Sequence, residues 1–407
     1  MQLTSRNKNP IDIPITKETK RSSSILSITL ILAGGFTCTG CLKISNVYKC
    51  GIIIAVIVNF LLALITYYTM ILGIMVMKEA KHFSAEQIWA TMSPKTRFIP
   101  ALSIFIPSFG FVFWYYGSVV SLVQNLLKMI FGNVNRYLND HIIICMIIFV
   151  VACSGYLLKQ DLSYITIITY IKFFTLLVMA CFEIIILTQE GVSHEMTYVS
   201  VSPSNLLNCV MQHVSAYSGL MLFYTYIWQM SSFTYRRARR SCYMTIAIVF
   251  TLLQVFGIVG YLILGNTQTG VIIDQFPPDS WITKSLYALF IILVSVSIPV
   301  LFQPAHRALL NYVITTRWFP KDVWSLSALV LMLIEIVIPM LTGQAINVAY
   351  FLMDFFCGTL CFILPAALYL TIIHDKTWYH ITGCILLIII GVSYSIFMIL
   401  RYFVLDI

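Results

Sequence analysis

The chain has 407 residues, of which 59% are hydrophobic and only 10% are charged. Together with a mean hydropathy of +0.90, this composition excludes an ordinary soluble domain and predicts a polytopic membrane protein. The formal net charge of +9 is divided among the connections between apolar segments, which argues against a nucleic-acid-binding protein. No segment is long and polar enough to form a soluble catalytic domain.

The apolar segments predict an all-α fold with about eleven transmembrane helices, each long enough to cross roughly 30 Å of hydrocarbon. Residues 1–24 are polar, contain Pro10 and Pro14, and are predicted to be a disordered cytosolic tail. The predicted spans lie near residues 25–45, 50–77, 99–129, 141–158, 163–188, 205–230, 242–265, 282–305, 323–341, 347–373 and 381–402. They form one transmembrane domain over residues 25–404.

The basic residues are distributed unequally between the two sides of this predicted bundle. Most of them lie in the tail or follow an even-numbered span, and the densest group is YRRARRS, after the sixth span. The opposite connections hold only Lys43, Lys49, Lys128, Arg136, Lys284 and Arg401. The positive-inside rule therefore predicts a cytosolic N-terminus and, with eleven spans, a C-terminus on the far side. The plasma membrane and a vacuolar or endosomal membrane both fit this pattern.

Two of the predicted spans contain small and polar residues where a regular apolar helix is expected. The first contains GGFTCTGCLK at residues 34–43, and the sixth contains HVSAYSGLM at residues 213–221. Irregular backbone in hydrocarbon must face protein or a cavity, because an unpaired peptide group facing lipid costs several kcal/mol. In transporters, helices broken at matching positions of two inverted repeats form the substrate site. The alternative is that the small residues only allow close helix packing.

The positions of the two patches predict a five-plus-five inverted repeat, with repeats near residues 25–188 and 205–373 and an extra helix near 381–402. A broken helix frees amides that can hold a carboxylate and carbonyls that can hold an ammonium, and the half-helix dipoles strengthen both. An α-amino acid presents both groups. The candidate substrate-binding residues are Thr37, Cys38, Thr39, Gly40, Ser215, Ala216, Tyr217 and Ser218.

Several stretches resemble the amino acid/auxin permease family of transmembrane amino acid transporters, and look nearest to its sodium-coupled neutral amino acid transporters. They are VFGIVGYLILGNTQTGVIIDQFPPDSW (residues 255–281), VSVSIPVLFQPAHRALLNYV (294–313), LLKQDLSYITIITY (157–170), SAYSG (215–219) and FILPAALYL (362–370). The resemblance covers nearly the whole chain after the tail. It implies eleven helices on a leucine-transporter-like scaffold and transport of amino acids with a cation.

The chain departs from this family pattern in its first, sixth and eighth spans. Ala33 stands where the sodium-coupled members have an asparagine, and Thr37 to Thr39 replace their Gly-x-Gly. Leu220 replaces a histidine, whereas Ser295 and Ser297 stand in place of two threonines and keep the hydroxyls. Because the asparagine carbonyl is missing, the resemblance favours a divergent first helix and an altered cation site.

Lys172 is the strongest candidate for ion coupling, because an ionisable side chain inside a membrane is functional by default. It lies about nine residues, or roughly 13 Å, into the fifth span. We expect its ammonium near Ser295 and Ser297, where it replaces the charge of a sodium ion and carries a proton. The alternative is a lysine that reaches the interface or pairs with a structural acid. Glu183, Glu335 and Asp354 are weaker candidates.

The sequence thus predicts a secondary active transporter for amino acids that is coupled to protons rather than sodium. A sodium-coupled neutral amino acid transporter and a non-transporting amino-acid sensor on the same scaffold stay open as alternatives. Paired carboxylates, His/Cys clusters and nucleophile motifs are missing, so we expect no enzyme, and the eleven cysteines have no metal-ligand spacing. We therefore expect no cofactor and no metal, and a monomer whose partners are an amino acid and the lipid bilayer.

Overall fold

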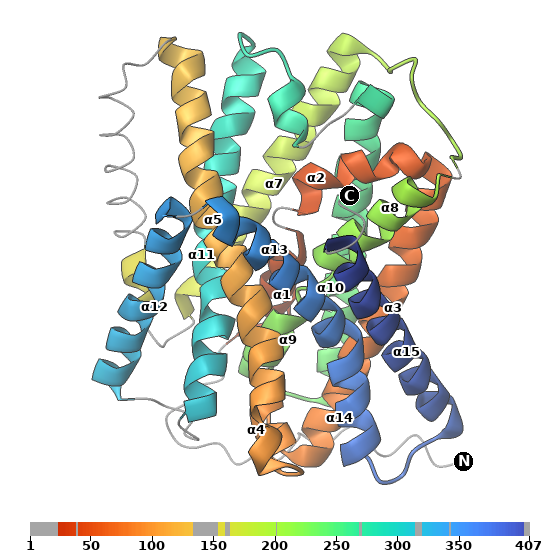
Figure 1. The fold of residues 1–407 in the computed structure, drawn as a ribbon, viewed down its shortest axis with the longest axis vertical. Coiled ribbons are helices and arrows are strands. Elements are labelled where there is room, and N and C mark those ends of the chain that lie inside the picture. The colour runs from red at the N-terminus through yellow and green to blue at the C-terminus, as the bar shows by residue number, and fades with distance from the viewer. Residues whose placement is uncertain are drawn as a thin grey trace.

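Helices form most of the described chain in the computed structural model (Figure 1). The structure describes residues 23–37, 40–132, 154–158, 163–200, 202–267, 271–313, 320–341 and 343–402. Within these ranges, seven helices are long and apolar enough to cross a membrane. Almost all of the predicted tail and of the predicted span at 141–158 lies outside the described residues.

The predicted first repeat begins with two short helices and continues with long ones. These helices are α1 (Ile25–Thr37), α2 (Gly40–Val47), α3 (Ile52–Ala80), the short α4 (Ala85–Ala90), α5 (Phe98–Phe131) and α7 (Ser163–Glu190). The three long helices match the predicted spans to within about three residues at each end, because the change from apolar to polar sequence is sharp there.

The predicted second repeat also begins with two short helices and continues with longer ones. It contains α8 (Pro203–Ala216), α9 (Leu220–Tyr226), α10 (Tyr235–Leu264), α11 (Trp281–Val313), α12 (Lys321–Leu341), α13 (Gly343–Gly358) and α14 (Leu364–Ile372). A π-helical turn, Thr359–Ile363, joins α13 to α14. The extra helix is α15 (Trp378–Leu400).

The helix α10 begins seven residues before the predicted span, so the arginine cluster is helical and not part of a connection. The Thr234 hydroxyl caps this helix by accepting a hydrogen bond from the Arg237 amide at 3.3 Å. Arg239 donates through Nε to the Tyr67 hydroxyl of α3 at 3.2 Å. A capped helix with long basic side chains places its polar first turns at the edge of the membrane region.

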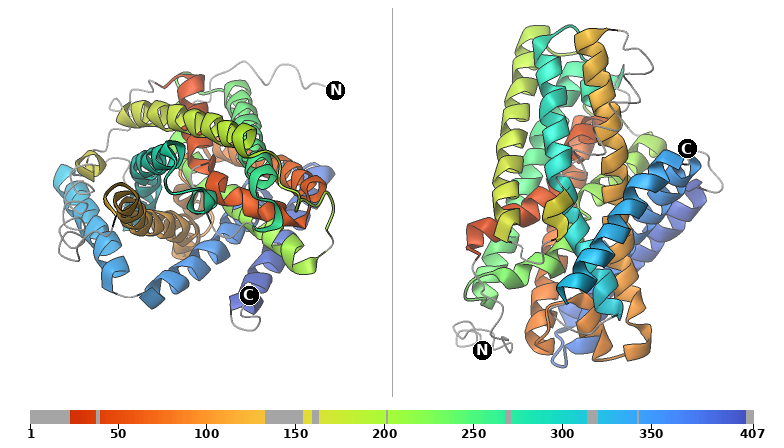
Figure 2. Two further views of the ribbon diagram at one scale, coloured as in Figure 1. Left: turned by 90° about the horizontal axis from the view of Figure 1, so that it is seen from above. Right: turned by 90° about the vertical axis from the view of Figure 1, so that its left-hand side faces the viewer.

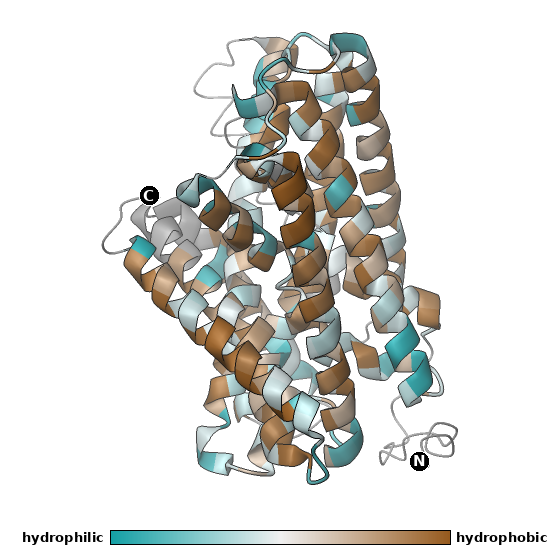
Figure 3. Ribbon diagram, turned by 90° about the vertical axis from the view of Figure 1, so that its right-hand side faces the viewer, coloured by the Kyte–Doolittle hydropathy of each residue, from teal (hydrophilic) through white to brown (hydrophobic). Residues whose placement is uncertain are grey.

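The bundle has α1 and α9 near its centre and α12 and α15 on its outside (Figures 1 and 2). The long helices α5 and α11 pack against each other, and α10 packs against α1, α2 and α3. Polar residues gather toward the ends of the helices (Figure 3), while Leu386 and Ile389 of α15 keep more than half of their surface exposed. Such an apolar outer face suits contact with lipid tails.

Two prolines interrupt the hydrogen-bond pattern of α11. Pro304 has no amide hydrogen, so the carbonyl of Val300, four residues earlier, loses its helical donor. The Tyr226 hydroxyl, at the end of α9, donates to this carbonyl at 2.9 Å. A side chain from one interrupted helix thereby completes the backbone of another.

The connection between α3 and α5 contains a buried carboxyl. Glu86 of α4 is only 3% exposed, and the Tyr224 side chain of α9 lies close enough to interact with it electrostatically. Phe83, just before α4, contacts the rings of Trp228 and Phe233, so this connection is packed under the end of α9. Burial raises the pKa of the Glu86 carboxyl to about 7, although its own amide and Ser84 oppose the change.

This raised pKa predicts that stability falls as pH rises. Below about pH 4.5 the carboxyl is protonated in both folded and unfolded chains. Between about 4.5 and 7 only the unfolded chain ionises, and above 7 the folded chain carries a buried charge. The effect is on the order of 3 kcal/mol. We expect Glu86→Gln to remove most of the difference in free energy of unfolding between pH 5 and pH 8, measured by chemical denaturation in detergent.

Glu190→Gln is the matched control, because Glu190 is exposed at the end of α7. It should leave the pH dependence of the wild-type protein unchanged. A Glu86→Gln protein with the wild-type pH dependence contradicts this interpretation.

Candidate functional site

The first and sixth predicted spans each consist of two shorter helices. In the sixth, α8 ends at Ala216 and α9 begins at Leu220, so residues 217–219 interrupt the span. In the first, α1 ends at Thr37 and α2 begins at Gly40, and Figure 1 shows α2 lying across the long axis of the bundle. Cys38 and Thr39 lie outside the described residues.

The two interrupted spans touch each other through glycines. A Cβ atom added to Gly40 would lie 3.1 Å from the Cβ of Ala216, at the end of α8. A Cβ on Gly219 would lie 2.7 Å from the Phe36 ring of α1, and one on Gly35 would overlap the Leu222 side chain of α9. The absence of side chains at these positions therefore allows four helix ends to meet in the middle of the bundle.

Neighbouring helices hold the interruption at residues 217–219 in place. The Tyr217 hydroxyl donates to Oδ1 of Asn59 on α3 at 2.7 Å. The Tyr217 carbonyl accepts from the Cys361 thiol, in the π-helical turn, at 3.7 Å. The Ser218 amide and hydroxyl both donate to the Ser215 carbonyl, at 3.2 and 2.6 Å. Since polar groups in the membrane interior must be satisfied by protein or by a cavity, these contacts stabilise the interrupted conformation.

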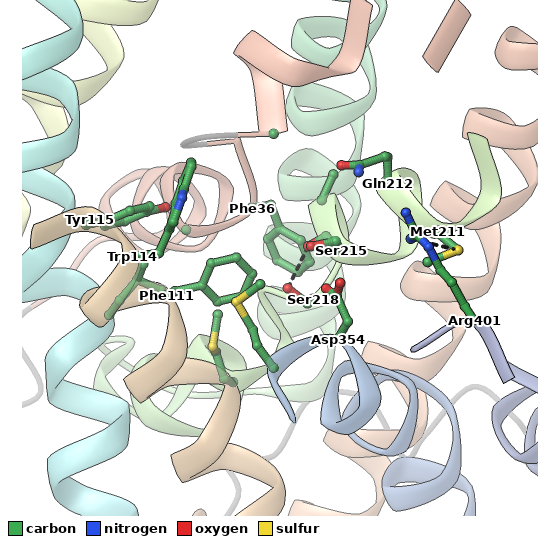
Figure 4. Close-up of a pocket in the computed structure, with 16 residues that line it drawn as sticks. Phe36, Phe111, Trp114, Tyr115, Met211, Gln212, Ser215, Ser218, Asp354 and Arg401 are labelled. Atoms are coloured by element: carbon green, nitrogen blue, oxygen red, sulfur yellow. Dashed lines mark hydrogen bonds between the residues drawn. The ribbon is translucent and has the colours of Figure 1, made fainter. Parts of the chain in front are cut away.

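A cavity of about 120 Å³ lies beside the two interruptions (Figure 4). A single buried water needs roughly 10–15 Å³, so the cavity is large enough for a small molecule. Its lining comes from both interrupted spans and from α5, α11, α13 and the residue after α15. The lining residues are Gly35, Phe36, Gly40, Phe111, Trp114, Tyr115, Met211, Gln212, Ser215, Ala216, Ser218, Met221, Leu301, Met353, Asp354 and Arg401.

The predicted substrate-binding residues are distributed unequally around this cavity. Gly40, Ser215, Ala216 and Ser218 line it. Thr37 is fully buried, and its hydroxyl donates back to the Ala33 carbonyl at 2.9 Å. Tyr217 is 1% exposed, and its hydroxyl is directed to Asn59 instead. A role in substrate binding stays a prediction for all eight residues.

Lys172 is fully buried and lies against the last turns of α1. A Cβ added to Gly34 would be 3.5 Å from Cδ of Lys172, so this glycine lets the lysine side chain pass close to α1. The helix α11 packs against both α1 and α7 and carries the two predicted serines. Ser297 is buried and donates to the Leu293 carbonyl at 2.6 Å, whereas Ser295 is partly exposed.

Ser295 and Ser297 lie on different faces of α11, because helix positions two residues apart do not point the same way. A contact between the Lys172 ammonium and either hydroxyl stays a prediction. The carbonyl of Ser295 is also relevant here, since Pro299, four residues later, cannot donate the helical hydrogen bond to it. Among the described residues, His, Cys, Asp and Glu nowhere form a group of three that could hold a metal ion.

Several residues of the cavity lining were not among the predicted binding or coupling residues. Phe111, Trp114 and Tyr115 come from α5, where the aromatic run FGFVFWYY in the middle of a predicted span was the available signal. Asp354 was only a weaker coupling candidate, and Arg401 was placed only in a connection on the far side. Both line the cavity.

Comparisons with known proteins agree on family and fold. A family model described as transmembrane amino acid transporter protein matches residues 21–404. The structure of MhsT in complex with L-phenylalanine has a TM-score of 0.62 at 14% identity, covering 94% of this chain and 99% of that one. No curated protein sequence matches the chain.

Two further solved structures have the same arrangement of helices. Mhp1, a nucleobase-cation-symport-1 family transporter, has a TM-score of 0.55 at 12% identity, covering 96% of this chain and 94% of that one. The Eremococcus coleocola manganese transporter has a TM-score of 0.59 at 15% identity, covering 99% and 92%. The predicted fold class is confirmed: the chain is an all-α, leucine-transporter-like membrane protein.

The contact between Gly219 and Phe36 predicts the effect of one added methyl group. Gly219→Ala would place Cβ within 3 Å of three atoms of the Phe36 ring, which is itself 2% exposed. Overpacking of this kind costs about 1–3 kcal/mol. We expect a lower thermal unfolding midpoint for the detergent-purified variant. Gly117→Ala in α5, with no atom within 4 Å of the new Cβ, is the control and should not lower the midpoint. Equal midpoints for the two variants would contradict the close contact.

Proposed function

The chain belongs to the transmembrane amino acid transporter protein family, and from this we propose that it moves amino acids by alternating access, driven by a proton gradient. The family and the fold support a transport protein and not an enzyme. The cytosolic N-terminus predicted from the distribution of basic residues, and a monomeric state, belong to the same proposal.

The observation that carries the proposal is the meeting of four helix ends beside a cavity. The last carbonyls of α1 and α8, and the first amides of α2 and α9, have no partner within their own helix. The helix dipoles place partial negative charge at the first two ends and partial positive charge at the other two. Backbone of this kind can bind the ammonium and the carboxylate of a free amino acid together. On the same fold, MhsT is described in complex with L-phenylalanine.

Proton coupling is proposed because of the position of Lys172. Its side chain lies against Gly34, and the next two residues of α1, Gly35 and Phe36, line the cavity. A buried ammonium is costly in a membrane interior, so its protonation depends on the arrangement of the helices around it. Alternating access changes that arrangement. Lys172 can therefore bind a proton in one state and release it in the other.

Transport into proteoliposomes tests the proposal. We expect a labelled amino acid to accumulate when a pH gradient is imposed without sodium, and to gain little from a sodium gradient. Lys172→Met should lose at least about 90% of gradient-driven accumulation, on the scale of a removed coupling group. It should still exchange internal for external amino acid, because the cavity itself is unchanged.

Lys128→Met is the matched control, because Lys128 is exposed in the last turn of α5. It should transport like the wild-type protein. An unchanged rate and unchanged ion dependence in Lys172→Met would remove the coupling role of this lysine. Accumulation that requires sodium would favour the sodium-coupled alternative, and binding without accumulation would favour a sensor.

A further inference from the structure

We propose that the cavity selects zwitterionic amino acids with large apolar, above all aromatic, side chains, and that Asp354 binds the substrate ammonium. This inference rests on the proposed function, since it names the substrate class of the same cavity. It depends on how polar and apolar groups are separated around the lining, and on the charged residues contributed by α13 and by the end of α15, where Arg401 follows the helix.

The polar groups of the lining gather on one side of the cavity (Figure 4). Ser215 and Ser218 come from the interruption between α8 and α9, and Figure 4 shows the Asp354 carboxylate directed toward them. Cys357, one turn further along α13, lies next to both Asp354 and Ser218. A carboxylate at the carboxyl end of α8 adds a full negative charge to the partial charge of the helix end. The strongest site for an ammonium in the cavity is therefore at Asp354.

The opposite side of the cavity is aromatic. Trp114 and Phe111 of α5 both line it, and the Tyr115 ring lies 5.5 Å from Trp114 and 6.5 Å from Phe111, measured between ring centres. Trp114 is half-buried and contributes to the cavity lining. Met221 and Met353 also line the cavity, and flexible thioethers adapt well to the edge of an aromatic ring. A large apolar side chain would cover this surface, whereas glycine would leave it exposed to water.

The two charged residues of the lining act against substrates with charged side chains. The Arg401 guanidinium contacts Met211 of α8 at 3.4 Å and contributes positive charge to the lining. An acidic substrate side chain in the aromatic half would lose its hydration without gaining a cationic partner there. A basic substrate side chain would likewise lose its hydration without gaining an anionic partner. Since Asp354 and Arg401 have opposite charges, a ligand without net charge matches the cavity best.

The first experiment measures binding to the detergent-purified wild-type protein by thermal shift, and uptake into proteoliposomes by competition. The probes are L-phenylalanine, L-tryptophan, L-leucine, glycine, L-alanine, L-lysine and L-glutamate. We expect L-phenylalanine to bind at least about tenfold more tightly than glycine or L-alanine, because even one methylene in an apolar pocket changes binding by about 10–200-fold. Lysine and glutamate should compete more weakly than phenylalanine.

Two variants separate the roles of the two sides. Trp114→Ala should weaken L-phenylalanine about tenfold or more while leaving glycine nearly unchanged. Its control is Trp378→Ala, since Trp378 is 78% exposed. Asp354→Asn should weaken L-phenylalanine but not 3-phenylpropanoate, which has the same ring and carboxylate and lacks the ammonium. Its control is Asp375→Asn, at an exposed position before α15.

Each outcome decides for or against the inference. Selective phenylalanine binding that responds to Trp114→Ala supports the substrate class, even if no accumulation is seen and the proposed transport function fails. Uptake of glycine, lysine or glutamate in preference to phenylalanine overturns the substrate class and leaves the transporter standing. An Asp354→Asn protein that loses phenylalanine and 3-phenylpropanoate equally overturns the ammonium contact, because a merely structural role affects both.

Discussion

The rule that backbone polar groups must be satisfied inside a membrane determines the centre of this molecule. Two spans are interrupted there, and each freed group requires protein or a ligand. The Tyr217 carbonyl receives the Cys361 thiol, and the carbonyl freed by Pro304 receives the Tyr226 hydroxyl. Gly40, at the start of α2, and Ala216, at the end of α8, line the cavity. The same constraint that forbids irregular backbone in lipid thus explains why the cavity is polar on the side where the helices break.

Close approach of the interrupted spans depends on residues with little or no side chain. Gly40 meets Ala216, and Gly219 lies under the Phe36 ring. Small residues permit the contact, as in membrane helix packing generally. Here the contact also brings helix ends of opposite dipole sign together. Close packing and substrate binding are therefore not competing explanations of the glycine-rich patches, because the packing creates the arrangement that can bind a zwitterion.

The sequence predicted the parts of the fold that depend on local pattern. The bounds of α3, α5 and α7 follow from the length of apolar runs, and the interruption at residues 217–219 follows from SAYSG. The start of α10 was placed late, because a run of arginines looks like a connection although Thr234 caps it as a helix. Trp114, Asp354 and Arg401 were not assigned to the site. They reach one cavity from α5, from α13 and from the residue after α15, and hydropathy does not report where helices cross.

On the proposed coupling by Lys172, the arrangement of α1 would link proton binding to substrate binding. Lys172 contacts this helix at Gly34, and the cavity begins at Gly35 and Phe36, within the same turn. By linkage, substrate binding changes the free energy of protonating Lys172 by a certain amount. Protonation of Lys172 changes the free energy of substrate binding by the same amount. Coupling then requires no long pathway through the protein. It requires one turn of α1 with two arrangements.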